Sequence, residues 1–213
     1  MPKIVDHERR REEIVQTTWR VIARRGLDGA TLREVAAEAG YANGAIKPYF
    51  PAKADLMEAT FRHVFSRTNA RSSAATEGLT GLEALRSFCL EVLPLDADRL
   101  DEARVVIAFW QQALHDPTQA EVNDAAMLQW RRSIRSWLSA ARGGGEGAAD
   151  GDGAADGDGA ADGDGGRPPV EVAAETLLTF LLGAQVAAVF DPAFNSPEQL
   201  VAQLDGQLAL LRG

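Results

Sequence analysis

Hydrophobic side chains recur every three or four residues along almost the whole chain, which is the spacing of one face of an α-helix. Alternating runs of β-branched residues, which would indicate strands, are absent from the sequence. The pattern therefore predicts an all-α protein. The long helices are expected at residues 6–25, 52–68, 81–93, 101–115, 118–141, 170–190 and 197–212, with two shorter helices between residues 31 and 50.

One stretch departs from this periodicity. Gly-Ala-Ala-Asp-Gly-Asp occurs three times between Gly147 and Asp164, with no apolar side chain larger than alanine. Such a segment buries too little apolar surface to offset the entropy of ordering it. Residues 143–169 are therefore expected to form a disordered acidic insertion, dispensable for dimerisation and DNA binding.

The segment from Thr31 to Phe50 has the features of a helix-turn-helix. Thr31 and Glu34 fit a capping box at a helix start. Ala36 is small enough for close helix packing, and Gly40 suits the sharp turn that follows. Ile46 is expected to pack the next helix back onto the first. A helix-turn-helix commonly places its second helix in the major groove of DNA.

The side chains around this turn are suited to DNA. Short side chains at a helix start allow close approach to the groove, and backbone N–H groups there favour phosphate. Asn43 is the candidate for reading a base, because a carboxamide can pair with adenine. A lone lysine is more often a solvated surface residue than a phosphate contact. The candidate DNA-binding residues are Thr31, Arg33, Ala42, Asn43, Gly44, Lys47, Tyr49 and Lys53.

Together these residues resemble the DNA-binding domain of the TetR family of bacterial repressors. The matching positions are Gly26, Thr31, Ala36, Ala39, Gly40, Gly44, Ile46, Tyr49, Phe50, Lys53 and Leu56. The resemblance implies a homodimeric repressor that binds a palindromic operator and releases it when a small-molecule effector enters a second domain. It implies an N-terminal three-helix domain at residues 1–51 and a C-terminal helical ligand-binding and dimerisation domain at residues 52–213.

Two positions differ from the usual family pattern. Lys47 stands where a tyrosine is most common, and Pro48 follows it. Proline lacks a backbone donor and obstructs continuation of a helix. The recognition helix is therefore expected to be short and to end at about Lys47.

The C-terminal half resembles the ligand-binding half of the BetI subgroup, at residues 104–117 and 177–192. Its aromatic residues lie on helices expected to surround a central space, where they could hold a flat apolar molecule or a cation, although such residues often only fill a core. The candidate pocket residues are Phe88, Phe109, Trp110, Met127, Trp130 and Trp137. The sequence does not identify the effector, and we expect effector binding to move the helix at 52–68.

The last two helices carry more apolar residues than one small domain needs to bury. Two copies of this pair could form a four-helix interface between protomers. The candidate dimer residues are Leu177, Phe180, Leu181, Ala184, Ala188, Leu200, Leu204 and Leu208.

The net charge of −9 is unusual for a DNA-binding protein, but its distribution removes the difficulty. Residues 1–68 contain 12 basic and 9 acidic residues, whereas the stretch 143–166 contains seven acids and no base. No uninterrupted run of about 18 apolar residues and no signal-peptide core is found. We therefore expect a cytoplasmic protein without a membrane partner, in which the single cysteine, Cys89, is buried.

The sequence shows no metal-ligand spacing, nucleophile motif or phosphate-binding loop, so neither an enzyme nor a cofactor is expected. The alternative functions are a helical protein-interaction module that does not bind DNA, or a small-molecule sensor. Binding of promoter DNA that weakens steeply with salt distinguishes a regulator from both.

Overall fold

The computed structural model describes residues 2–42, 44–143 and 168–212, and every regular element in these ranges is an α-helix, as predicted. The elements are α1 (Pro2–Gly29), α2 (Leu32–Glu38), α3 (Lys53–Ala75), α4 (Gly81–Val92), α5 (Ala97–Ala113), α6 (Pro117–Gly143), α7 (Val170–Phe190) and α8 (Pro197–Arg212).

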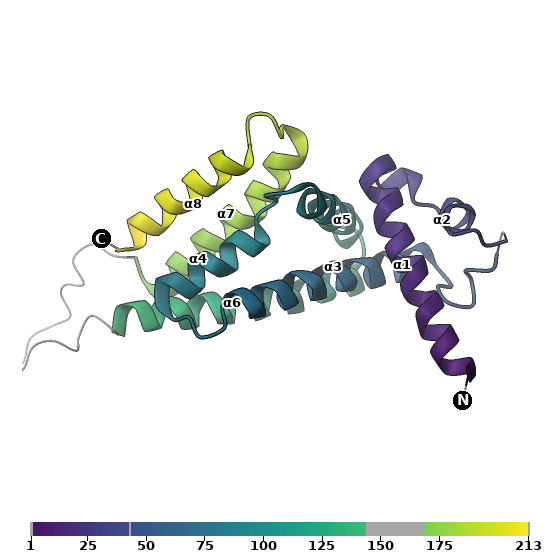
Figure 1. Ribbon diagram of the computed structural model, residues 1–213, viewed down its shortest axis with the longest axis horizontal. Helices are drawn as coiled ribbons and strands as arrows, with labels where there is room; N and C mark the ends of the chain where they lie inside the picture. Colours follow the sequence, from purple (N-terminus) through teal and green to yellow (C-terminus); the bar gives the residue numbers. More distant parts are fainter. Residues whose placement is uncertain (1, 43, 144–167, 213) are drawn as a thin grey trace, which may run out of the picture.

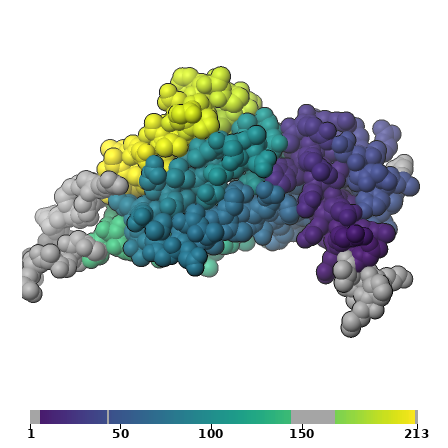
Figure 2. Space-filling model, in the orientation of Figure 1, coloured from purple at the N-terminus to yellow at the C-terminus, as the bar shows by residue number. Residues whose placement is uncertain are grey.

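The long helix α3 connects the two ends of the molecule. It starts beside α1 and α2 at one end and runs along α6 into the bundle that also contains α4, α7 and α8 (Figure 1). Helix α5 lies between the two ends and packs against α1 as well as against α3, α6 and α7. In the space-filling view the N-terminal helices form one end of an elongated molecule (Figure 2).

Most helix boundaries follow local signals. Gly26 has φ 69° and ψ −175°, which interrupts α1 with a kink where the first helix was expected to end. Asp96 accepts a hydrogen bond from the Arg99 N–H at 2.8 Å, and this cap starts α5 four residues earlier than predicted. Helix α3 ends seven residues later than predicted, before Gly78, which has φ 74°.

Three apolar clusters hold the chain together. An N-terminal core joins α1, α2 and the start of α3, and a main core joins α3 to α8. Between them, a junction core packs α1 against α3 and α5; it contains Val21, Ile22, Ala30, Met57, Val64, Val105 and Ala108. The two ends are thus joined by buried apolar contact. Cys89 lies in the main core, as expected, and burial raises the pKa of its thiol.

Helix α7 is the only described helix whose length and composition would suit a membrane span. Slightly less than half of its apolar window, 44%, is buried inside the chain. The core helix of a helical bundle has the same properties, and α7 contacts α5, α6 and α8.

The insertion expected at residues 143–169 lies mostly outside the described residues. Its two ends are described and lie close together. The Arg142 guanidinium at the end of α6 donates a hydrogen bond to the Pro168 carbonyl, just before α7, at 2.6 Å.

Candidate DNA-binding surface and effector cavity

Helix α2 begins as its sequence predicts. The Glu34 N–H donates to the Thr31 hydroxyl at 3.2 Å, and the hydroxyl donates to the Glu34 carboxylate at 2.8 Å. The hydrogen bond from Thr31 lowers the pKa of Glu34. Gly40 then takes φ 76° in the turn, and the Tyr41 N–H closes the end of α2 on the Ala36 carbonyl at 2.8 Å.

The expected recognition helix is a series of turns at residues 44–49, not an α-helix. The Lys47 N–H bonds to the Gly44 carbonyl and the Tyr49 N–H to the Ile46 carbonyl, each spanning three residues. Pro48 supplies no N–H, and Gly44 has φ 88°, so neither end favours an α-helical turn. Ile46, 1% exposed, anchors this segment on Val35 and Ala36 in the N-terminal core, as predicted.

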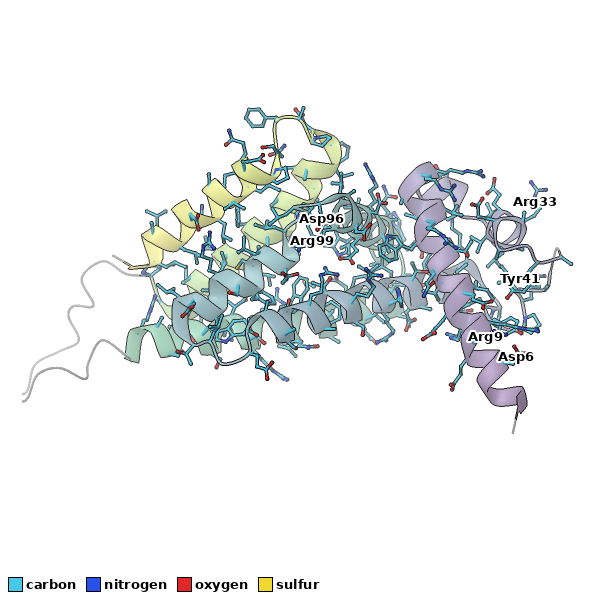
Figure 3. The ribbon with its side chains drawn as sticks, viewed as in Figure 1. Asp6, Arg9, Arg33, Tyr41, Asp96 and Arg99 are labelled. Atoms are coloured by element: carbon cyan, nitrogen blue, oxygen red, sulfur yellow. The ribbon has the colours of Figure 1, made fainter. Side chains whose placement is uncertain are left out.

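The candidate DNA-binding residues divide into two groups. Thr31, Arg33, Ala42, Gly44 and Lys47 are exposed; Figure 3 shows Arg33 at the far end of the molecule, away from the helical bundle. Asn43 lies outside the described residues.

The other two candidates are engaged by the chain itself. The Lys53 ammonium donates to the Leu27 carbonyl at 2.8 Å, which ties α3 to the end of α1. The half-buried Tyr49 ring lies 4.5 Å from the ring of His7. Lys53 thus has a contact within the fold, and its use as a phosphate contact stays a prediction.

Sequence reasoning missed the arginines of α1 beside this surface. Arg11 donates to the Tyr49 carbonyl at 2.8 Å, and its guanidinium lies 4.3 Å from the centre of the Phe50 ring. Hydrogen bonding to Tyr49 raises the pKa of Arg10, and the exposed Arg9 pairs with Asp6 at 3.1 Å (Figure 3). The run of three arginines was the available signal.

A small cavity lies where α3, α4, α5, α6 and α7 meet. Its volume is about 20 Å³, room for a single water molecule. The site is thus closed in this conformation. Its lining is Phe61, Phe65, Thr68, Val92, Glu102, Val106, Trp110, Met127, Trp130, Leu182 and Gln185.

Half of the predicted pocket residues line this cavity, namely Trp110, Met127 and Trp130. The other three pack nearby. Phe109 stacks on Phe61 with ring centres 4.1 Å apart. Phe88 contacts both Trp130 and Trp137 with ring centres within 5.6 Å.

The cavity also contains polar groups that the sequence analysis missed. Glu102 is 5% exposed and accepts two hydrogen bonds from Arg71, at 2.9 and 2.7 Å. Gln185 is also 5% exposed and places a carboxamide at the cavity wall. A lone amide in the apolar stretch 180–190 was the signal that could have revealed it.

Trp110 and Leu182 separate this cavity from an open groove between α5, α6 and α7, since both residues line both spaces. The groove has a volume of about 550 Å³. The Trp110 indole N–H donates to the Asn123 side-chain carbonyl at 2.9 Å. Trp110 therefore forms part of the wall between the groove and the cavity.

The candidate dimer residues require a correction. Leu177, Leu181, Ala184, Ala188, Leu200, Leu204 and Leu208 are all buried within the single chain, and Phe180 is half-buried. Helical spacing identified the inward faces of α7 and α8, because it cannot distinguish a core inside one chain from an interface. The outward face of α7 is mainly uncharged, with Glu171 and Glu175 near its start. Its uncharged residues are Val172, Thr176, Thr179, Gly183, Val186 and Phe190.

An exposed turn preceded by a capped helix, joined to a helical bundle with a closed and mainly apolar cavity, is the arrangement typical of a helical DNA-binding regulator. Residues 14–60 match the profile of the bacterial regulatory proteins of the tetR family, and residues 81–161 match the BetI-type transcriptional repressor C-terminal domain. The chain is 32% identical over 139 residues to the HTH-type transcriptional regulator PksA of Bacillus subtilis, covering 65% of this chain and 68% of PksA. The chain therefore belongs to the TetR family of transcriptional regulators.

Other relatives agree with this assignment. The HTH-type transcriptional regulator BetI of Burkholderia lata is 34% identical over 122 residues, which cover 55% of this chain and 61% of that protein. A transcriptional regulator from Rhodococcus is 28% identical, covers 94% of this chain and 95% of its own, and superposes with a TM-score of 0.78. A regulator from Saccharomonospora viridis, solved in complex with choline, is 20% identical with a TM-score of 0.80 and coverage of 95% and 96%.

Proposed function

We propose that the protein is a cytoplasmic homodimeric repressor, with residues 1–51 as the DNA-binding domain and residues 52–213 as the effector-binding and dimerisation domain. It binds a palindromic operator and leaves it when a small organic cation enters the cavity beside Glu102. The observation that carries the proposal is the physical connection of the two sites, because α5 lines the cavity and also packs against α1 in the junction core.

The DNA-binding surface consists of the exposed residues of α2 and the following turns. Arg33 and Lys47 supply positive charge for phosphate, and Arg9 lies on α1 at the same end of the molecule (Figure 3). Ala42 and Gly44 have no long side chains, so the backbone there can approach the major groove closely. We retain Asn43 as the candidate for a base contact.

The effector class follows from the cavity lining. Aromatic rings stabilise a cation over their faces, and the buried carboxylate of Glu102 adds negative charge. The Saccharomonospora viridis neighbour was solved with choline, which supports choline as the first probe. Because the described cavity holds only a single water, binding requires Trp110 to move away from Asn123.

The outward faces of α7 and α8 form the dimer interface. Val172 is 52% exposed, Phe190 80% and Leu210 73%, so these helices leave apolar area uncovered in one chain. Two copies packed along these faces would place the two DNA-binding surfaces about a two-fold axis, as a palindrome requires.

A gel-shift experiment tests this function. Fluorescent DNA from the region upstream of the protein's own gene should be bound at low salt, with affinity falling steeply as salt rises. Choline should release the DNA, and Glu102→Gln should remove the response to choline. Failure to bind any fragment of that region would contradict the repressor function, and choline and DNA bound together without mutual weakening would contradict derepression by choline.

A further inference from the structure

A continuous line of side chains leads from the cavity to the DNA-binding end. It starts at Glu102 on α5, which lines the cavity. Arg67 on α3 lies with its Nε 3.4 Å from a Glu102 carboxylate oxygen. The guanidinium of Arg67 in turn lies 4.5 Å from the centre of the Trp19 ring on α1.

We infer that Arg67 transmits effector binding from Glu102 to α1, because an effector that binds Glu102 displaces the Arg67 guanidinium from it. This inference rests on the proposed function and assigns the residue through which the cavity acts on the DNA-binding end. A cation that takes the place of Arg67 at Glu102 frees its guanidinium, and Trp19 then loses the charge held over its ring. The contact between α1 and α3 at Trp19 is thereby weakened, and α1 shifts relative to α3 on the junction core.

The occupancy of Glu102 explains why Arg67 is the group displaced. A carboxylate offers about four acceptor positions. Arg71 takes two of them with bonds of 2.9 and 2.7 Å, which leaves the longer contacts of Arg67 and the Thr68 hydroxyl, both at 3.4 Å. Arg71 is further fixed by Glu91 at 3.2 Å. An arriving cation therefore competes with the more weakly held of the two arginines.

Trp19 is placed to receive the change. It packs against the junction core on α1, and its ring also lies 6.2 Å from the ring of His63 on α3. Cation–π contact depends on the position of the charge over the ring face. Loss of that charge therefore alters a contact between α1 and α3 without removing the apolar core beneath it.

A double-mutant cycle on the full-length protein tests Arg67 without an effector. Glu102→Gln retains the shape of Glu102 but removes its charge and replaces one acceptor oxygen with a donor NH₂ group, so it removes the charge that attracts Arg67. Glu102→Gln and Arg67→Gln should each weaken binding to the upstream DNA roughly 5- to 150-fold, the usual range of allosteric coupling. The double variant should be no weaker than the single variants, because both break the same link.

Two further variants separate transmission from folding. Arg67→Lys should restore binding, since a single long contact and a charge over a ring do not need a guanidinium. Arg62→Gln is the matched control on α3. Arg62 pairs with Glu58 at 2.8 Å, whereas Arg67 is the α3 arginine that contacts Glu102 and Trp19, so the DNA affinity of Arg62→Gln should equal that of the unmodified protein. With choline as the probe, Arg67→Gln should bind choline but no longer release DNA.

The outcomes are distinct. If the effects of Glu102→Gln and Arg67→Gln multiply in the double variant, or if Arg67→Gln retains full release by choline, the role of Arg67 is overturned while the repressor function stands. If the unmodified protein binds no DNA, the proposed function fails and the role of Arg67 fails with it.

Discussion

The DNA-binding surface and the cavity differ in how the chain assembles them. The surface comes from one continuous stretch, residues 31–50, whose side chains are largely exposed. The cavity takes its lining from five helices between Phe61 and Gln185, and most of those side chains are buried. A surface of the first kind can change its sequence with little effect on folding, whereas a change at the cavity alters folding and recognition together.

The largest expected effect is on the free energy of unfolding, and it compares a buried with an exposed residue of the helical bundle. Phe109→Ala removes a ring that is 0% exposed and stacked on Phe61, so the free energy of unfolding should fall by about 3–5 kcal/mol. Urea denaturation followed by circular dichroism measures it. Leu114→Ala is the control at the end of the same helix, where the side chain is 78% exposed, and should change stability by less than about 0.5 kcal/mol.

A smaller effect tests the polar lining of the cavity. Gln185→Leu replaces a buried amide of the cavity lining with an apolar side chain of similar size. Affinity for choline, measured by calorimetry, should fall about tenfold, equivalent to about 1.4 kcal/mol. Gln112→Leu is the control, because it makes the same substitution on α5 at a residue that does not line the cavity. Equal loss of choline binding in both variants would contradict a direct role for Gln185.

The third effect is on the salt dependence of DNA affinity, and it distinguishes two lysines at the DNA-binding end. Lys47→Ala should reduce the slope of log affinity against log salt by about 0.9, the value for one lost phosphate contact. Lys53→Ala should leave the slope unchanged, because its ammonium is held by the Leu27 carbonyl. Fluorescence anisotropy at several salt concentrations measures both slopes. A reduced slope for Lys53→Ala and an unchanged slope for Lys47→Ala would contradict the proposed DNA-binding surface.

The smallest effect lies between the two regions, at His63. Burial, and then the charge of Arg67, lowers the pKa of His63 below its unfolded value of about 6.5. The unfolded chain therefore binds the proton more readily, and stability should decrease as the pH falls below about 6.5. His63→Gln should show a shallower decrease between pH 7.5 and 5.5 in thermal unfolding. Equal slopes for the two proteins would show that His63 is not responsible.

Sequence periodicity was sufficient for the helices but not for their partners. The bounds of α7 and α8 follow from apolar spacing and flanking prolines, and the cap of α2 follows from Thr31 and Glu34. Whether Leu204 faces its own chain or a second one depends on contacts with distant helices, which spacing does not contain. The same holds for Lys53, whose partner Leu27 is 26 residues away.

The sites show the same division. The exposed turn was found because its features are local, although Pro48 weakened the helix more than expected. Half of the candidate pocket residues line the cavity, because aromatic residues in a sequence indicate a core without showing which rings border a space. Glu102 and Gln185 are single polar residues on apolar helices, and only the packing of α5 and α7 brings them to one cavity.

The contact between Arg142 and Pro168 has a practical consequence for engineering. The end of α6 and the start of α7 are joined by a hydrogen bond of 2.6 Å. An inserted segment therefore needs to span only a short distance between its two ends. The entropy of closing such a loop grows slowly with its length. A fluorescent protein inserted there would lie beside the bundle, far from the DNA-binding end (Figure 1), and would label the regulator away from its DNA contacts.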